Sequence, residues 1–449
     1  MVTIAIDCGA SFLKAAKMQN GRILRQLQIQ TPPKPAANSS KNADKKLIER
    51  LLEAVCNILT DLTAGETEVG LGISNEMHGF VLALEDGTPF TDHISWQQEL
   101  GDITVAPEGK SSREILQEHF CAAPGVRFRY TGMPLRAGLP SCNLLYLSRA
   151  GNLAGAPNQL FFYTLGDYLL CRLAGCAPDI HPTNAAATGL YDLEKKDWDE
   201  ELTAFCCSGA RIMFPTVGGR SLDFCFGETR IHALPAIGDQ QAALLGAGLE
   251  EMETISFNLG TGAQVSVLSD NPSPEEGVQI RPYFGGRSLC TIPHIPCGRA
   301  LNVYFRFVRD LLSRFEVDVD ERVIWDKVLE MERDGVECGL FCDLSFFENA
   351  ITPNRAGSIS QIGEYTLTGA NLFHAVLRAM IENFLRCADK LAQPDGRFRK
   401  ILFSGGVARR IEAIRDGIVR HYLPGITITV AENETLFGIA RYLSMDNGA

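Results

Sequence analysis

The stretch Gly238–Val265 constrains the fold more strongly than any other part of the chain. It joins an acidic residue in a turn, a segment rich in Ala, Leu and Gly, and two apolar runs separated by Gly-Thr-Gly. The small residues favour a helix that packs closely against a sheet, because glycine lets two backbones approach each other. We therefore expect an α/β fold in which a strand ends and a helix begins at Asp239.

Asp239 itself has two interpretations. An Asp between a strand and a helix can cap the helix by accepting a hydrogen bond from a free backbone N–H, which is the commoner role for such a residue. The same position can hold a general base above a cleft. The residues Gly238–Gln241 alone do not decide between the two.

Two glycine-bearing hairpins, one in each half of the chain, suggest one phosphate clamp that is built twice. ETISFNLGTGAQVSVLS predicts a strand, a hairpin at Gly260–Gly262 and a second strand. Near the N-terminus, apolar residues lead to Asp7, and a turn with Gly9 and Ser11 precedes Lys14 on the returning strand. Glycine lets backbone N–H groups approach a phosphate, although such a hairpin alone is more often only a tight turn. An Asp beside these donors can hold a hydrated Mg²⁺.

Polar residues that follow a buried strand suggest a polyol site. The apolar run EVGLGIS ends in Asn75–Gly79, and ligands of α/β sheets bind beyond the carboxyl ends of strands. Further on, Trp96 precedes Gln97 and Gln98, a ring and two amides that suit the apolar face and the hydroxyls of a sugar. Structural roles compete with both ideas, since a lone His is more often structural and a Trp can simply cover a domain edge.

Hydrophobic periodicity predicts several helices. Leu47–Leu62 and Asn371–Leu391 carry apolar residues at helical spacing. A capping box of Ser111 and Glu114 begins a further helix. Residues 141–208 are expected to be mainly helical with long connections.

Other segments are expected to connect or extend the sheets. Residues 32–46 are polar and contain prolines, which predicts a loop. Residues 272–365 are predicted to form a long insertion in the second half. KILFSGGVARR predicts a strand, a turn at Ser404–Gly406 and a helix. Glycine in this turn can let the backbone lie against an adenine ring, although a plain β–α turn is the simpler interpretation.

Length and composition narrow the class of protein. The 449 residues are too many for a single core, so two or three domains are expected. The net charge of −12 argues against a broad surface for nucleic acid or anionic membranes, and no apolar run is long enough to span a bilayer. The fourteen cysteines include no C-x-x-C pair. The N-terminal residues lack the apolar core of a signal peptide. We therefore expect reduced core thiols in a cytoplasmic protein.

In combination, these motifs resemble the FGGY family of carbohydrate kinases in the actin-like ATPase superfamily. The resemblance covers nearly the whole chain. The segments that carry it are Asp7–Lys14, Glu76–Gly79, Ser95–Gln97, Gly166–Leu169, Thr183–Gly189, Trp198–Leu202, Gly238–Gln241, Gly260–Gly262 and Ser404–Ala408. Each is weak alone, and their shared order makes the match specific.

The resemblance implies an α/β fold of two ribonuclease-H-like (actin-like ATPase) domains that flank a central cleft. We place the first, with the sugar-binding side and the first phosphate hairpin, at residues 1–232. The second, with the nucleotide-binding side, is placed at residues 233–449. The resemblance also implies ATP and Mg²⁺ as cofactors and a small sugar as substrate, with no nucleic-acid or membrane partner. A homodimer is left open.

The resemblance further implies a role for each matching residue. Asp239 corresponds to the general base that takes a proton from the sugar hydroxyl, and Asp7 to the residue that helps to hold Mg²⁺. The residues implied in binding ATP are Gly9, Ser11, Lys14, Gly260, Thr261, Gly262, Gly405 and Gly406. Those implied in binding the sugar, with Asp239, are Met77, His78, Trp96 and Gln97. Phosphoryl transfer suits these residue types, because it needs positioning, charge neutralisation and a base.

Motifs within the family bear on the identity of the sugar. Met77–Gly79 is similar to the xylulose-kinase branch, whereas the segments around Ser95–Gln97, Pro282–Arg287 and Phe346–Ser360 look nearer to sedoheptulokinases. A ketose is therefore expected, with sedoheptulose as the first choice and xylulose as the second. The departures from the family pattern are Ala10 for a Thr, Glu76 for a Gln, Gln98 for an Asp, and Asn143 and Tyr146 for a Lys and a Trp.

Two other classes of function remain as alternatives. An iron–sulfur activator of a dehydratase would need paired thiolates at a dimer interface, and no spacing marks two cysteines for that role. A sugar-binding regulator without catalysis would not need both Asp7 and Asp239, which are intact. The kinase is the preferred hypothesis.

Overall fold

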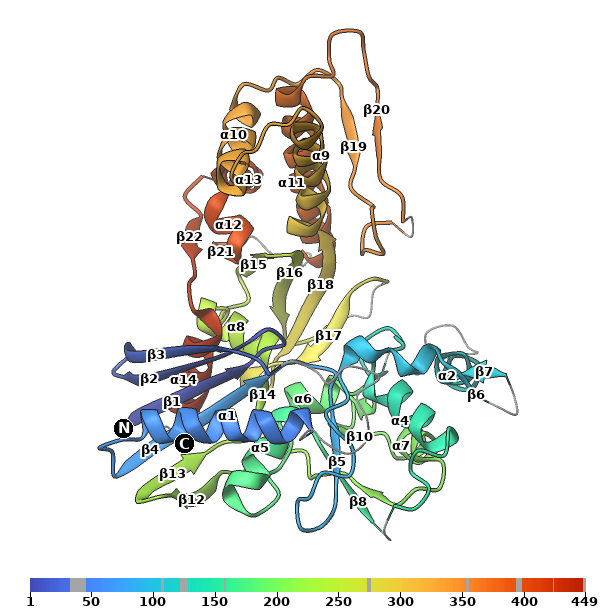
Figure 1. The fold of residues 1–449 in the computed structure, drawn as a ribbon, viewed down its shortest axis with the longest axis vertical. Coiled ribbons are helices and arrows are strands. Elements are labelled where there is room, and N and C mark those ends of the chain that lie inside the picture. The colour runs from blue at the N-terminus through green and yellow to red at the C-terminus, as the bar shows by residue number, and fades with distance from the viewer. Residues whose placement is uncertain are drawn as a thin grey trace. The chain divides into compact units, whose positions relative to one another are not determined.

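The computed structural model describes residues 1–32, 46–105, 109–121, 128, 130–156, 159–272, 276–352, 355–392, 398–422 and 424–446. Contacts divide the chain into two units (Figure 1). The first comprises Met1–Gly246, Arg281–Arg287 and Asn433–Ala449, and the second Ala247–Ile280 and Ser288–Glu432. The domain boundary between residues 232 and 233 stays a prediction. The loop predicted at 32–46 lies, apart from its two end residues, outside the described residues.

A seven-stranded sheet forms the centre of the first unit. Its order is β12-β13-β4-β1-β2-β3, and β14 also pairs with β4. β1, β2 and β3 are antiparallel, whereas β4 runs parallel to β1, and β13 and β14 run parallel to β4. The strands are β1 Val2–Cys8, β2 Phe12–Gln19, β3 Arg22–Gln30, β4 Glu68–Asn75, β12 Leu222–Phe226, β13 Thr229–Ala233 and β14 Ile237–Gly238.

The predicted N-terminal hairpin is present, and a second hairpin follows it. Asn20 and Gly21 have positive φ angles of 50° and 72°, which a two-residue turn between twisted strands requires. The register of β1 places Asp7 opposite Lys14 on β2 and beside Ser74 on β4. The first phosphate hairpin and the strand before the sugar segment are therefore direct neighbours in the sheet.

Helices cover both faces of this sheet. α1 (Leu47–Leu62) has its predicted bounds and buries its apolar stripe in the core with β1 and β4. On the other face, α14 (Glu434–Asp446) packs on the same two strands. A Cβ at Gly72 of β4 would lie 2.4 Å from Ile439 Cγ2, so a glycine there lets α14 approach the sheet. The last helix of the chain thus completes the first unit.

A second core of the first unit surrounds a three-stranded sheet of the order β11-β8-β5. The predicted capping box is confirmed, because Ser111 and Glu114 each accept a hydrogen bond from the other's backbone N–H at the start of α2. The expectation of a mainly helical 141–208 is wrong in two places. Leu160–Tyr163 forms strand β8, and β9 and β10 form a short hairpin.

The remaining elements of the first unit are helices and short strands. They are β5 Val81–Ala83, η1 Trp96–Gln98, η2 Leu100–Asp102, β6 Thr104–Val105, β7 Lys110–Ser111, α2 Ser112–Phe120, α4 Pro140–Arg149, β8 Leu160–Tyr163, α5 Leu165–Ala174, α6 Pro182–Ala186, β9 Tyr191–Asp192, β10 Asp197–Trp198, α7 Glu200–Cys207, β11 Ile212–Met213, α8 Asp239–Ala247 and η3 Phe284–Gly286.

The second unit contains a six-stranded sheet of the order β17-β18-β16-β15-β21-β22. Here too, three antiparallel strands, β18, β16 and β15, are followed by two that run parallel to their neighbours. The sheet of the first unit follows the same plan. The predicted insertion at 272–365 is wrong for its first part, because β17 (Gln279–Pro282) and β18 (Ser288–Pro296) belong to the sheet.

Helices and a hairpin complete the second unit. The predicted helix at 371–391 is confirmed as α11, which begins slightly earlier, at Gly369. The predicted helix after Ser404 is divided at Ile411 into α12 and α13. The remaining elements are β15 Thr254–Leu259, β16 Gly262–Ser269, α9 Gly298–Arg314, α10 Glu321–Arg333, β19 Phe341–Asp343, β20 Ser358–Ser360, α11 Gly369–Leu391, β21 Lys400–Ser404, α12 Gly406–Arg410, α13 Glu412–Val419 and β22 Thr427–Val430.

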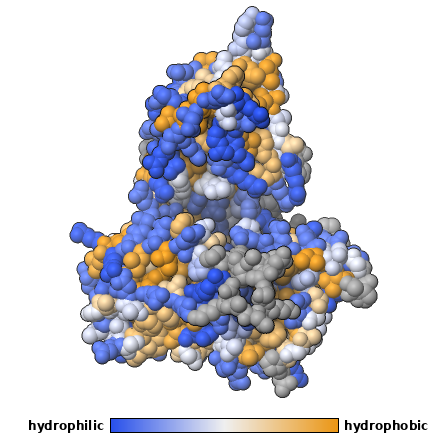
Figure 2. Space-filling view, in the orientation of Figure 1, coloured by the Kyte–Doolittle hydropathy of each residue, from blue (hydrophilic) through white to orange (hydrophobic). Residues whose placement is uncertain are grey.

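The surface mixes polar and apolar side chains, as Figure 2 shows for one face. Exposed apolar residues of the second unit include Phe307, Leu311 and Phe315, on α9 and just after it. No helix among the described residues combines the length and the apolar content needed to cross a membrane. All cysteines are free thiols and most are buried, which confirms the prediction of core thiols.

Candidate active site

Strands β1, β4 and β14 end at one edge of the first sheet, and the candidate catalytic residues stand at these ends. Asp7 of β1 lies beside Ser74 of β4, and Gly238 of β14 lies beside Asn75. Parallel strands present their carboxyl ends together, which is where α/β proteins place ligands. The fold thus brings Asp7 and Asp239 to the same edge of the sheet.

Asp7 is a buried carboxylate with a defined partner. Its Oδ1 accepts a hydrogen bond of 2.8 Å from Ser74 Oγ, and Lys14 stands opposite it in the register of β1 and β2. Burial raises the pKa of Asp7, whereas the Ser74 hydrogen bond and the Lys14 charge act in the opposite direction.

Asp239 is the first residue of α8 and is partly buried. Its Oδ1 accepts a hydrogen bond of 2.8 Å from the N–H of Gln240, the next residue. The usual N-cap bond instead reaches two or three residues along the helix. Burial raises the pKa of Asp239 to about 7, and the negative charges of Asp7 and Glu76 add to the increase. A carboxyl that titrates near neutral pH suits a general base better than an ordinary Asp does.

A buried polar network holds the turn that precedes Asp239. Asn184 Nδ2 donates to Asn75 Oδ1 at 3.1 Å and to the Ala236 carbonyl at 2.9 Å. Asp167 Oδ1 accepts a hydrogen bond of 3.0 Å from the Ala236 N–H. All these residues are buried, so the loss of one partner would leave a polar atom unsatisfied. Residues of two family motifs thus support the strand end.

Gly238 fits its position because a side chain would have no room. Its N–H donates to Thr183 Oγ1 at 3.1 Å. An added Cβ would lie 2.7 Å from Gln241 Oε1 and 3.0 Å from Met77 Sδ. The Gly-Asp pair therefore allows Asp239 to stand close to the predicted sugar segment.

The sugar segment after β4 carries Met77 and His78. His78 has a positive φ of 65°, a backbone region that non-glycine residues adopt rarely and often at functional sites. Its Nδ1 lies 2.6 Å from the Ala187 carbonyl. This ring nitrogen must therefore carry the proton and donate, which fixes the orientation of the imidazole.

Trp96 and Gln97 lie in the short helix η1, and the Ser95 hydroxyl accepts a hydrogen bond of 3.3 Å from the Gln97 N–H. Trp96 is 44% exposed, so its ring has a surface that a sugar could stack on. Gln97 lines a cavity of about 350 Å³.

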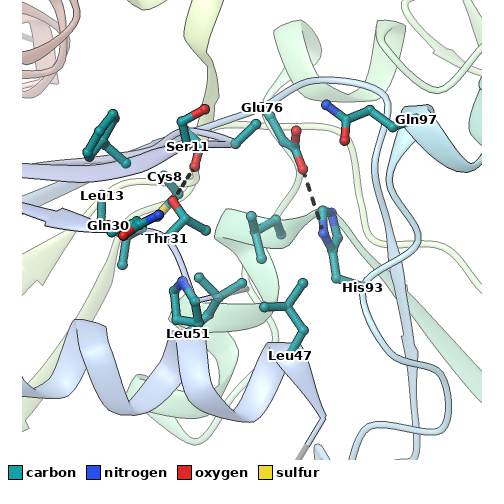
Figure 3. Close-up of a pocket in the computed structure, with 15 residues that line it drawn as sticks. Cys8, Ser11, Leu13, Gln30, Thr31, Leu47, Leu51, Glu76, His93 and Gln97 are labelled. Atoms are coloured by element: carbon teal, nitrogen blue, oxygen red, sulfur yellow. Dashed lines mark hydrogen bonds and ion pairs between the residues drawn. The ribbon is translucent and has the colours of Figure 1, made fainter. Parts of the chain in front are cut away.

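This cavity joins the N-terminal hairpin to the predicted sugar segments. Figure 3 shows Ser11 on one side and Glu76, His93 and Gln97 on the other. Glu76 Oε1 and His93 Nδ1 are 3.7 Å apart, and both residues are buried. Asp239 does not belong to the described residues that line this cavity.

Gly9 shapes the turn at the start of this cavity. Its N–H donates to the Phe12 carbonyl at 3.2 Å, and its own carbonyl accepts a hydrogen bond of 2.8 Å from Thr31 Oγ1. An added Cβ would lie 3.0 Å from the Phe12 carbonyl oxygen. Ser11 follows and is exposed.

The predicted ATP turns of the second unit adjoin each other. Gly405 has a φ of 90°, and an added Cβ would lie 2.4 Å from the Leu259 carbonyl oxygen and 3.0 Å from the Gly260 nitrogen. The turn at Gly405–Gly406 therefore packs directly on the hairpin at Gly260–Gly262. Gly298, at the start of α9, donates its N–H to the Gly260 carbonyl at 3.1 Å. Sequence reasoning missed Gly298, which no motif marks.

Sequence reasoning also missed Arg281, which begins a short segment of the first unit, whereas the residue before it belongs to the second. This arginine is buried, and its Nη1 lies 3.8 Å from Met77 Sδ. Burial lowers the pKa of Arg281 to about 10, Arg136 adds to this decrease, and the charge of Asp239 opposes it. An arginine within the apolar strand sequence QIRPYF was the available signal.

A magnesium ion would depend on Asp7 and on the phosphates of its ligand. Among the described residues, no three His, Cys, Asp or Glu side chains gather into a metal site. Mg²⁺ usually keeps several waters and binds through one or two carboxylates together with substrate phosphates. A single buried Asp fits that mode of binding.

Comparison with known proteins gives the family. The model of the FGGY family of carbohydrate kinases, N-terminal domain, matches residues 2–252. An apulose kinase from Pectobacterium atrosepticum is 25% identical over 60% of this chain and 55% of its own. A glycerol kinase from Rhizobium rhizogenes is 29% identical over 43% of this chain and 38% of its own. The chain thus spans about half or less of the length of these curated relatives.

Solved structures show the same fold. The xylulose kinase from Rhodospirillum rubrum matches with a TM-score of 0.80 and 16% identity, over 100% of this chain and 90% of that one. The gluconate kinase from Lactobacillus acidophilus matches with a TM-score of 0.78 and 17% identity, over 100% and 90%. The predicted α/β class with ribonuclease-H-like, actin-like domains is confirmed. Since the family model matches more than half of this chain, the chain belongs to the FGGY family of carbohydrate kinases.

Proposed function

We propose that this protein transfers the terminal phosphoryl group of ATP to a hydroxyl of a small sugar. The observation that supports this most directly is the placement of Asp7 and Asp239 at the ends of β1 and β14, on either side of β4. One buried carboxylate is paired with Ser74, and burial raises the pKa of the other to about 7. The two environments suit a metal-binding group and a base.

In this proposal Asp239 accepts the proton of the attacking hydroxyl. Its carboxylate stays in place because Asn75, Asn184 and Asp167 hold the preceding turn. Since the transition state of phosphoryl transfer is loose, the hydroxyl proton leaves late and modest basicity suffices. Asp7 would hold the magnesium ion, which neutralises phosphate charge when it is bound.

We propose that the second unit supplies most contacts to ATP. Its two turns, Gly260–Gly262 and Gly405–Gly406, pack on each other and are free of bulky side chains. Backbone N–H groups in such turns can approach phosphates and a flat base. Gly9, Ser11 and Lys14 of the first unit would add donors for the terminal phosphate.

The acceptor in this proposal is a ketose, with sedoheptulose as the first candidate and xylulose as the second. Met77, His78, Trp96 and Gln97 would contact it. The exposed ring of Trp96 and the fixed imidazole of His78 support this assignment. We also propose a cytoplasmic enzyme, and its oligomeric state stays open.

Acceptor-dependent ATP consumption tests the proposal. Purified protein would be given Mg-ATP with sedoheptulose, xylulose, ribulose, fructose, glycerol or the corresponding aldoses, and ADP formation would be followed by a coupled assay. We expect a ketose to raise the rate well above the rate without a sugar, with ribulose and glycerol poor. The same low rate with every acceptor would reject the kinase, and a good rate with an aldose alone would reject the ketose.

A further inference from the structure

A short segment carries an arginine from the second half of the chain into the first unit. Arg281–Arg287 groups with the N-terminal unit, while the residues on both sides of it group with the second. The segment turns at Gly285 and Gly286, whose φ angles of 68° and 75° favour glycine. The Tyr283 N–H donates to the Arg287 carbonyl at 2.8 Å and closes this turn.

Contacts on both sides anchor the segment within the first unit. The Pro282 carbonyl accepts a hydrogen bond of 3.5 Å from Gln241 Nε2, two residues beyond Asp239. The ring of Phe284 lies 5.6 Å from that of His181 and 5.5 Å from that of Tyr442. An aromatic cluster of this kind gives the segment a defined position. These contacts of Pro282 and Phe284 therefore help to fix the backbone that carries Arg281.

The position of Arg281 is the unusual feature. It is only 5% exposed, and arginine is almost never fully buried unless its charge is paired. Its guanidinium reaches Met77, in the predicted sugar segment, at 3.8 Å, and it interacts electrostatically with Asp239. One cation thus contacts the predicted sugar segment and also interacts with the charge of the candidate base.

We propose that Arg281 is a specificity-determining residue of the acceptor site, which donates hydrogen bonds to oxygen atoms of the sugar next to the reacting hydroxyl. This inference rests on the proposed function. A guanidinium has five N–H donors in a rigid fork, so it can keep its contacts with the protein and still donate to a ligand. The ligand class is an oxygen-rich acceptor with adjacent hydroxyl or carbonyl oxygens, because such pairs match the fork.

Binding of the acceptor without ATP tests this role apart from catalysis. The variants are Arg281→Met, which keeps much of the apolar stem, and Arg281→Lys, which keeps the charge but loses the fork. Arg287→Met is the matched control, since it removes the same charge from an exposed residue of the same segment. Calorimetry would give the dissociation constants of the ketose and of ATP, and thermal unfolding would report the folded state.

We expect Arg281→Met to weaken ketose binding about 10- to 100-fold, the range for losing a hydrogen bond to a charged group. Arg281→Lys should lie between this variant and the wild type, while ATP binding and the Arg287→Met control stay within about twofold of the wild type. In turnover, KM for the ketose should rise more than kcat falls. Ketoses that lack one hydroxyl would locate the contact. The analogue without the hydroxyl that Arg281 contacts should bind the wild type and Arg281→Met with the same affinity.

Unchanged ketose binding in a folded Arg281→Met variant would overturn the inference. So would unfolding of both Arg281 variants at the assay temperature, which would assign the arginine a structural role. If the wild type binds a ketose but transfers no phosphoryl group, the proposed function fails while Arg281 remains tested by binding. If the wild type binds no sugar, both fail.

Discussion

Replacing Asp239 by Asn should stop turnover while leaving the structure intact. The amide retains an oxygen that can accept the hydrogen bond from Gln240 N–H, which is 2.8 Å long in the wild type. It has nearly the same volume, so Gly238 and Met77 should keep their close contact. It removes the group that accepts a proton. The substitution therefore separates proton transfer from packing.

The expected loss follows from the role of a base. General-base catalysis typically contributes about 100- to 10,000-fold to the rate, so kcat should fall by that factor. The dissociation constant of the sugar should rise by no more than about tenfold, because the amide oxygen still accepts a hydrogen bond from the hydroxyl, although a neutral acceptor binds it more weakly than a carboxylate does. Asp223→Asn is the control, since Asp223 is an exposed Asp of the same unit.

The pKa of Asp239 also predicts how the reaction rate depends on pH. With a pKa of about 7, only about a tenth of the carboxyl is ionised at pH 6. We therefore expect kcat/KM for the sugar, measured at an ATP concentration well below the KM for ATP, to be about tenfold lower at pH 6 than on the plateau at higher pH. An Asp with the ordinary pKa would give no fall in that range.

The raised pKa of Asp239 also makes the stability of the protein depend on pH. The folded pKa of Asp239 lies above its ordinary value of 3.8, so the folded state binds more protons than the unfolded state between these two values. The free energy of unfolding therefore falls as the pH rises through that window. Asp239→Asn does not titrate and should be at least as stable as the wild type at pH 8. Equal losses of turnover and of sugar affinity would refute the assignment of Asp239 as a base, as would a flat pH profile.

Three further substitutions test other parts of the site. Gly405→Ala and its control Gly425→Ala both place a side chain at a φ near 90°, which costs about 1–2 kcal/mol. Because only the Ala at 405 also meets backbone atoms, Gly405→Ala should lower the free energy of unfolding in urea by about 1–3 kcal/mol more than Gly425→Ala does, and it should bind ATP more weakly. Equal losses of stability in the two variants would count against the packed turns. Asn184→Ala removes two buried hydrogen bonds and should lower the free energy of unfolding by about 1–3 kcal/mol, whereas an unchanged urea midpoint would contradict the supporting network. Glu76→Gln removes a negative charge that raises the pKa of Asp239, so the acid limb of kcat/KM should move to lower pH, and an unmoved limb would show that Glu76 does not act on the base.

Local signals in the sequence predicted local structure well. The helix at Leu47–Leu62 and the capping box at Ser111 follow from periodicity and from side-chain chemistry, and both are present in the structure. The hairpin after Asp7 and the strand ends at Asp7 and Asp239 follow from similar rules. Each of these features depends on residues that are close in the chain.

Features that depend on distant contacts were missed. The apolar run at Phe161–Tyr163 has no period of its own, so it falls within the predicted helical region, and only its pairing with β5 and β11 makes it a strand. β18 was placed in an insertion because no motif shows that it pairs with β16. The segment that carries Arg281 is anchored by distant contacts, such as those of Phe284 with His181 and Tyr442, which no local pattern encodes.

The most direct test of phosphoryl transfer is to identify its product. Wild type and Asp239→Asn would be incubated with Mg-ATP and sedoheptulose or xylulose, and the sugars would be analysed by mass spectrometry. We expect a sugar monophosphate to accumulate in step with ADP in the wild type, and to be nearly absent with the variant. ADP formation without a phosphorylated sugar, or equal product from both proteins, would contradict a sugar kinase that uses Asp239 as its base.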